Sequence, residues 1–118
     1  MLQEVKSYIQ LAADEANKAG SRGEVPVGAV LVDSVNDEII AAAGNRTKEF
    51  TDPTAHAELL VIQQGGRRLE NTHLTGCDLY VTLEPCPMCA QAISFARIRR
   101  LYFGAYDPKG GGVEHGAR

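Results

Sequence analysis

The sequence has no long apolar run. Its longest stretch without a charged residue, residues 85–96, contains two prolines, two cysteines and a glutamine, so we expect no membrane span and no membrane partner. Charged side chains at Glu4, Lys6, Asp14 and Glu15 interrupt the first residues, which excludes the apolar part of a signal peptide there. These absences predict a cytoplasmic protein.

The sequence also has few cysteines and no excess of positive charge. Three cysteines are an odd number, which in a cytosolic protein argues against a disulfide framework and favours metal binding or redox chemistry. The formal net charge is −3 and the isoelectric point is about 5.6. Bulk charge therefore gives no support for nucleic-acid binding, although a local basic patch can provide it.

The length of 118 residues, with no internal repeat and no linker, suits a single domain over residues 1–118. Hydrophobic spacing and turn residues divide the chain into seven elements. We expect Gly65-Gly66 to end or break one of the helices. The predicted elements are a helix over residues 2–19, strands over 27–33 and 38–43, a helix from 54 or 55 to about 64, a strand over 78–83, a helix over 87–98 and a strand over 100–105. Residues 106–118 hold four glycines and are expected to be irregular.

The order of these elements, α-β-β-α-β-α-β, predicts an α/β layered domain with a mixed sheet. The first two strands are joined by a short polar link and form an antiparallel hairpin, whereas the later strands are joined by helices.

Cys86 and Cys89 form a C-x-x-C motif at the predicted start of a helix. Residues three apart lie on one face of a helix. The free N–H groups and the dipole at a helix N-terminus favour the thiolate, which is the form that binds metal. The alternatives are a redox pair or two buried thiols, and the motif alone does not separate them.

His56 and Glu58 lie where the preceding helix is predicted to begin. A lone histidine is usually structural, and a lone helix carboxylate is usually solvated. In the first turn of a helix, however, both side chains can approach an ion that lies off the helix end. Two helix starts, one with His56 and one with the cysteine pair, can then converge on one metal ion.

The number of ligands indicates the kind of site. A structural zinc site has four protein ligands, whereas three ligands leave a position for water, as in catalytic sites. Cys77 is better interpreted as a small buried hydrophobe, and His73 and His115 as solvated. The bound ion would lower the pKa of water, and Glu58 would carry protons between the water and the substrate.

These residues resemble the cytidine deaminase superfamily, whose motifs are H-x-E followed by P-C-x-x-C. Further stretches resemble the bacterial tRNA-specific adenosine deaminases within it: residues 23–32, 44–46, 52–58, 79–86 and 96–107. The resemblance implies a three-layer α-β-α sandwich with a mixed sheet, one zinc ion per chain, a homodimer, and conversion of adenosine to inosine at the wobble position of a tRNA anticodon loop.

Substrate contacts follow from the resemblance at three positions. Asn45 matches an asparagine that hydrogen-bonds the target base, Asp107 an aspartate near the target ribose, and Val27 an apolar contact in the base pocket. Each has a simpler reading, because Asn45 and Asp107 suit turns and Val27 suits a buried strand. The family continues into a further strand and a C-terminal helix that contributes to tRNA binding. We therefore expect residues 1–118 to form the deaminase domain without that helix.

Two other functions compete with tRNA deamination. A deaminase of a free base or nucleoside, such as guanine or cytosine, would use the same chemistry in a different pocket. A zinc-stabilised interaction domain without catalysis would leave Glu58 without a purpose. RNA binding would rest on basic residues in loops, each of which is more often ordinary surface charge. The candidates are Arg46, Lys48, Arg67, Arg68, Arg99, Arg100 and Lys109.

Overall fold

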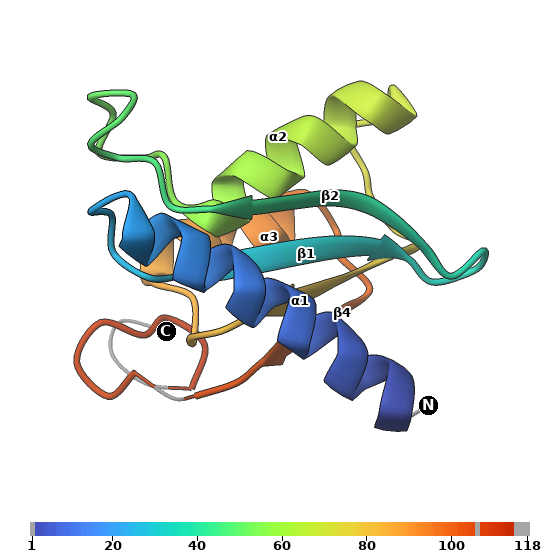
Figure 1. Cartoon of the computed structure of the whole chain (residues 1–118). Coiled ribbons are helices and arrows are strands. Elements are labelled where there is room, and N and C mark those ends of the chain that lie inside the picture. The colour runs from blue at the N-terminus through green and yellow to red at the C-terminus, as the bar shows by residue number, and fades with distance from the viewer. Residues whose placement is uncertain (1, 106, 115–118) are drawn as a thin grey trace.

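A computed structural model describes residues 2–105 and 107–114 of the chain (Figure 1). The order of helices and strands is the predicted one. The elements are α1 (Leu2–Ser21), β1 (Gly28–Asp33), β2 (Glu38–Gly44), α2 (Ala57–Leu69), β3 (Cys77–Val81), α3 (Pro87–Phe95) and β4 (Arg100–Phe103). No helix in this part of the chain is both long enough and apolar enough to cross a membrane.

The four strands form one sheet in the order β2-β1-β3-β4. Strand β1 is antiparallel to both β2 and β3, and β4 is parallel to β3. The register of β1 against β2 shifts between Leu31 and Val32, where Ile40 of β2 is passed over in the pairing. The predicted mixed sheet and the predicted hairpin are therefore both confirmed.

The helices cover the sheet on both faces. Figure 1 shows α1 crossing one face, with α2 and α3 on the other. Alternate residues of β1 point to opposite faces of the sheet, so Leu31 packs with α2 and α3, whereas Val30 packs with α1. Tyr80 joins the α1 layer, where its ring stacks on Tyr102 with centroids 4.7 Å apart. The α-β-α sandwich is confirmed.

Helix α1 approaches β1 closely at Gly28. A Cβ atom there would lie 2.0 Å from the carbonyl oxygen of Ala12 and 2.5 Å from the backbone nitrogen of Ala16. We expect Gly28→Ala to lower the free energy of unfolding by about 3 kcal/mol, because a helix backbone must move to admit the methyl group. Gly76→Ala is the control, since a Cβ there meets nothing within 4 Å. Urea unfolding of both variants measures the difference, and equal loss in both would contradict this packing.

The prediction that Gly65-Gly66 ends or breaks the second helix is wrong. Helix α2 continues to Leu69 and ends at Glu70, which adopts a left-handed conformation with φ 51°. Gly65 is used for packing, because a Cβ there would lie 2.4 Å from the buried Leu31 side chain. The tertiary contact therefore outweighs the low helix propensity of glycine.

The remaining boundaries differ by a few residues. Helix α2 begins at Ala57 rather than at residue 54 or 55, because the chain before it is held in a turn by Asp52. Helix α3 ends at Phe95 instead of residue 98, and Arg97 adopts a positive φ of 57° beyond it. Residue 106 and residues 115–118 of the predicted irregular tail, including His115, lie outside the described residues.

Candidate metal and active site

His56 and Cys86 occupy equivalent places at the starts of two helices. Each is the N-cap residue of its helix, His56 for α2 and Cys86 for α3, and each has an extended backbone. Before His56, the side chain of Asp52 accepts hydrogen bonds from both the N–H and the hydroxyl of Thr54, which fixes the turn into the helix. Pro87 opens α3, where its missing N–H costs nothing.

The two helix starts bring three metal-binding groups together. The Nδ1 atom of His56 lies 3.7 Å from the Sγ atom of Cys86 and 3.4 Å from that of Cys89. All three ligand atoms lie within 4.8 Å of one another. A nitrogen and a sulfur that share a tetrahedral zinc ion are separated by about 3.6 Å. The spacing of the three groups therefore fits one zinc ion.

Glu58 lies one residue beyond the start of α2, beside this cluster. Its side chain is 4% exposed, and its Oε1 atom has no hydrogen-bond partner among the described residues. Burial raises the pKa of its carboxyl, against the opposing effects of its own N–H, His56 and Cys89. A buried carboxyl oxygen without a protein donor is suited to receive a proton from a small molecule in the site.

The donor set also fits a cation electrostatically. Burial, with the neighbouring Glu58 and Cys86, raises the pKa of the Cys89 thiol. The Cys89 thiol and the Glu58 carboxyl are both buried, so ionising the two groups side by side is costly, and a divalent ion offsets that cost. The chemistry of the cluster therefore agrees with its spacing.

Asn45 links the start of α2 to a cavity next to the cluster. Its Oδ1 atom accepts a 2.8 Å hydrogen bond from the N–H of Ala57, the first residue of the helix. This bond fixes the orientation of the side chain, since an N–H must face an oxygen. The Nδ2 atom donates to no acceptor within residues 2–105 and 107–114, so its two N–H groups remain available to a ligand.

The cavity has a volume of about 200 Å³ and opens beside the metal-binding cluster. It brings together all the predicted substrate-binding residues and, of the predicted metal and catalytic residues, all but Cys89. Its lining residues are Val25, Val27, Asn45, His56, Glu58, Leu83, Glu84, Cys86 and Asp107. A cavity of this size is smaller than the pockets that hold drug-sized ligands, and suits a single ring system.

Asp107 reaches the cavity from a turn that Glu84 anchors. The Glu84 carboxylate is buried and accepts hydrogen bonds from the N–H groups of Asp107 at 3.1 Å, Val113 at 3.1 Å and Glu114 at 2.7 Å. The Oδ1 atom of Asp107 accepts a 3.0 Å bond from the N–H of Gly110, so part of this carboxylate holds its own turn.

The cavity lining also includes three residues that were not predicted from the sequence: Val25, Leu83 and Glu84. A detectable signal existed for Glu84, because the position between the strand predicted over residues 78–83 and Pro85-Cys86 is unusual for a solvated charge. Two of the residues that we excluded from the site, Cys77 and His73, are absent from the cavity lining and from the metal-binding cluster. Cys77 is buried in the hydrophobic core, as predicted, and burial raises the pKa of its thiol. His73 is exposed.

The site combines one imidazole and two thiols, which suit a metal ion, with a buried carboxyl beside a small cavity. On an α-β-α sandwich, this combination is typical of metal-dependent hydrolytic enzymes. The chain belongs to the family described as the cytidine and deoxycytidylate deaminase zinc-binding region, whose model matches residues 2–105. It is thus a zinc-dependent deaminase.

Within this family the sequence is similar to the tRNA-specific adenosine deaminases. It is 60% identical to the one from Agrobacterium fabrum over 111 residues, which are 94% of this chain and 72% of that protein. A solved structure from studies of A-to-I editing by tRNA:A34 deaminases is 59% identical, superposes with a TM-score of 0.92, and is matched over 96% of this chain and 85% of its own. The guanine deaminase of Bacillus subtilis is 35% identical with a TM-score of 0.82, over 86% of this chain and 64% of its own.

Proposed function

We propose that this chain converts adenosine to inosine at the wobble position of a tRNA anticodon loop. The observation that carries the proposal is the zinc-type cluster with Glu58 beside a cavity of the size of one base, in a chain 60% identical to a tRNA-specific adenosine deaminase. The base must leave the stack to enter such a cavity, and a single-stranded loop presents bases that are already unstacked or easily splayed.

The zinc ion would be held by His56 through Nδ1 and by Cys86 and Cys89 through Sγ. When bound, zinc supplies a Lewis acid that lowers the pKa of water toward neutrality. His56 and Cys86 are the N-cap residues of α2 and α3, and their carbonyl oxygens accept the first hydrogen bonds of these helices. The helices therefore fix where both metal-binding residues lie. Three protein ligands leave one position for water or substrate.

Glu58 would move the protons. Its buried carboxylate takes a proton from the attacking water and delivers it to the ring nitrogen of adenine, and a second proton transfer releases the exocyclic amine as ammonia. Adenosine and water then give inosine and ammonia, with no oxidant or reductant. Burial, which raises the pKa of Glu58, favours the protonated carboxyl that donation to the amine requires.

Three further residues would bind the substrate. The Nδ2 group of Asn45 can donate to an acceptor on the base, because its Oδ1 atom is already bonded to Ala57. Val27 is buried and offers an apolar contact within the cavity. Asp107 lies on the turn at the edge of the cavity, where a ribose hydroxyl could reach the carboxylate oxygen that its own turn leaves open.

Lys48 and Lys109 are the best placed of the predicted RNA contacts. Both are exposed, and both follow cavity-lining residues closely in sequence. Three other candidates are engaged in ion pairs: Arg46 with Glu49, Arg68 with Glu38, and Arg99 with Asp78. RNA affinity should fall steeply with salt if these lysines contact phosphates.

A homodimer in the cytoplasm is part of this proposal. The N-terminal turn of α3 carries the site, and the same helix exposes Met88 and Phe95, the latter 71% exposed. A second copy that covers these apolar side chains would bury them from water. Sedimentation of the zinc-loaded protein measures the state of association, and a monomer at all concentrations would contradict the dimer.

The test is a deamination assay on zinc-loaded protein. An anticodon stem-loop with adenosine at the wobble position is offered beside free guanine, cytosine and adenosine. We expect inosine in the stem-loop and no turnover of the free compounds. Turnover of guanine alone would replace this substrate by the second candidate, which the 35% identity to a guanine deaminase supports less strongly.

A further inference from the structure

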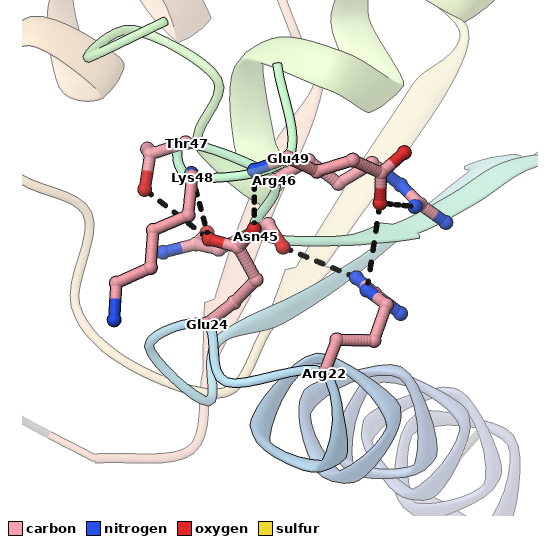
Figure 2. A network of polar contacts seen from close by, with 7 residues as sticks. All are labelled: Arg22, Glu24, Asn45, Arg46, Thr47, Lys48 and Glu49. Carbon is pink, nitrogen blue, oxygen red and sulfur yellow. Dashed lines mark hydrogen bonds and ion pairs between the residues drawn. The ribbon is translucent and has the colours of Figure 1, made fainter. Parts of the chain in front are cut away.

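Glu24 is a buried carboxylate outside the metal cluster, and it holds the turn that follows the cavity-lining residue Asn45. It is 6% exposed and lies between α1 and β1. Figure 2 shows its carboxylate pointing to the turn that follows Asn45. Oε1 accepts hydrogen bonds from the N–H of Lys48 at 3.0 Å and the hydroxyl of Thr47 at 3.3 Å, and Oε2 accepts one from the N–H of Glu49 at 2.9 Å.

These bonds cap a single helical turn. The N–H of Phe50 bonds the carbonyl oxygen of Arg46 at 3.0 Å, which closes the turn. The first N–H groups of such a turn have no partner within it, and a carboxylate from elsewhere in the chain can satisfy them. Burial opposes the charge of Glu24, but the N–H groups of Lys48 and Glu49 and the Thr47 hydroxyl lower its pKa, so the turn is held by an anion.

The same segment that carries Glu24 also borders the cavity. The lining includes Val25 and Val27 of this segment and also Asn45, which lies directly before the turn. The N–H of Asn45 bonds the carbonyl oxygen of Val27 at 3.1 Å, and the guanidinium of Arg22 bonds the carbonyl oxygen of Asn45 at 3.1 Å. Residues 22–27 therefore hold both Asn45 and the turn that follows it (Figure 2).

We propose that Glu24 is a positioning residue for substrate binding: its carboxylate fixes the turn over residues 46–50 and, through that turn, the Asn45 side chain at the cavity. This inference rests on the proposed function, because it takes Asn45 as a contact of the target base. Among the described residues, the Glu24 carboxylate bonds only to Thr47, Lys48 and Glu49, and its replacement leaves the bond between the Ala57 N–H and Asn45 in place. The start of α2 with His56 and Glu58 is then retained, so we expect the effect on binding and not on the chemical step. A shift of the turn would move the Asn45 amide relative to Glu58 and the metal-binding residues, so a base placed for reaction beside them would lose its contact with Asn45.

The test compares Glu24→Gln with Glu49→Gln in the zinc-loaded protein. The first variant keeps the shape of the side chain but replaces one acceptor oxygen by a donor group that faces an N–H. The second removes an exposed charge of the same turn and its ion pairs with Arg22 and Arg46, and leaves the bonds to Glu24 in place. We expect KM to rise about tenfold in Glu24→Gln with kcat within twofold, and no change in Glu49→Gln.

Two measurements separate positioning from simple stabilisation. Amide hydrogen exchange at Lys48 and Glu49 should accelerate in Glu24→Gln, whereas zinc content should stay at one per chain. A folded variant with unchanged KM would overturn the inference, as would unchanged exchange at these amides. If Glu24→Gln does not fold, Glu24→Asp, whose shorter side chain cannot reach both N–H groups, must show the same rise in KM.

The wild-type protein distinguishes this inference from the proposed function. If wild type turns over a free base and not the stem-loop, the proposed substrate is wrong, and the KM comparison is then made on that base. Equal KM values for wild type and Glu24→Gln on whichever substrate is used would reject the role of Glu24 alone.

Discussion

Replacing Glu58 by glutamine is expected to lower kcat for deamination by about 10³-fold while zinc content and fold are retained. The amide has nearly the volume of the carboxyl, so the packing at the start of α2 is preserved. It cannot take a proton from water or deliver one to the base, and general acid–base catalysis typically accounts for 10² to 10⁴ in rate. Single-turnover kinetics with bound substrate and metal analysis of the same sample measure both quantities.

The control for Glu58→Gln is Glu38→Gln. Glu38 is exposed and pairs with Arg68 away from the cavity, so the rate should not change. A deamination rate in Glu58→Gln within threefold of wild type would remove Glu58 from the mechanism. Loss of zinc in that variant would instead make Glu58 a ligand, against the three-ligand site.

Replacing Cys86 by alanine is expected to have the largest effect on stability. The variant should bind less than one tenth of an equivalent of zinc and should lose deamination altogether. Metal binding to the folded chain stabilises it, by about 4 kcal/mol at a free zinc concentration a thousandfold above Kd, and this contribution disappears with the site. Thermal unfolding with and without added zinc measures the effect.

Cys77→Ala is the matched control for the cysteine change. Cys77 is also a free cysteine, but it is buried in the core away from the cluster. This variant should retain one zinc per chain and the zinc-dependent rise in melting temperature, with only a modest loss of stability from the smaller side chain. Retention of zinc by Cys86→Ala would show that Cys86 is not a ligand.

The sequence allowed the arrangement of the site to be predicted because the relevant geometry is local. Cys86 and Cys89 lie three residues apart at a helix start, and His56 and Glu58 share another helix start. Each pair is therefore placed by one turn of backbone, which turn and helix signals identify. That the two turns meet depends on the sheet: β2 and β3 both run antiparallel to β1, so the chain leaves both strands at the same end.

Features that depend on distant packing could not be predicted in this way. Glycine has a low helix propensity, so Gly65 alone predicts the end of a helix. The close packing of its backbone against Leu31 explains why α2 continues through it. Glu24 and Glu84 are charged residues in apolar surroundings, but their partners are backbone N–H groups 24 and 23 residues later, at Lys48 and Asp107. Nothing in a local pattern specifies such partners.

The hydrogen bond from Ala57 to the side chain of Asn45 bears on redesign of the pocket. The residue proposed to read the base also completes the first turn of the helix that presents His56 and Glu58. A substitution at position 45 would therefore change both the contact with the base and the position of the catalytic residues. In a library that varies this position, changes in selectivity could not be separated from changes in rate. The Val27 side chain can be varied without this effect, because only the Val27 backbone is hydrogen-bonded to Asn45. New base preferences should therefore arise more cleanly at position 27, with Asn45 left unchanged.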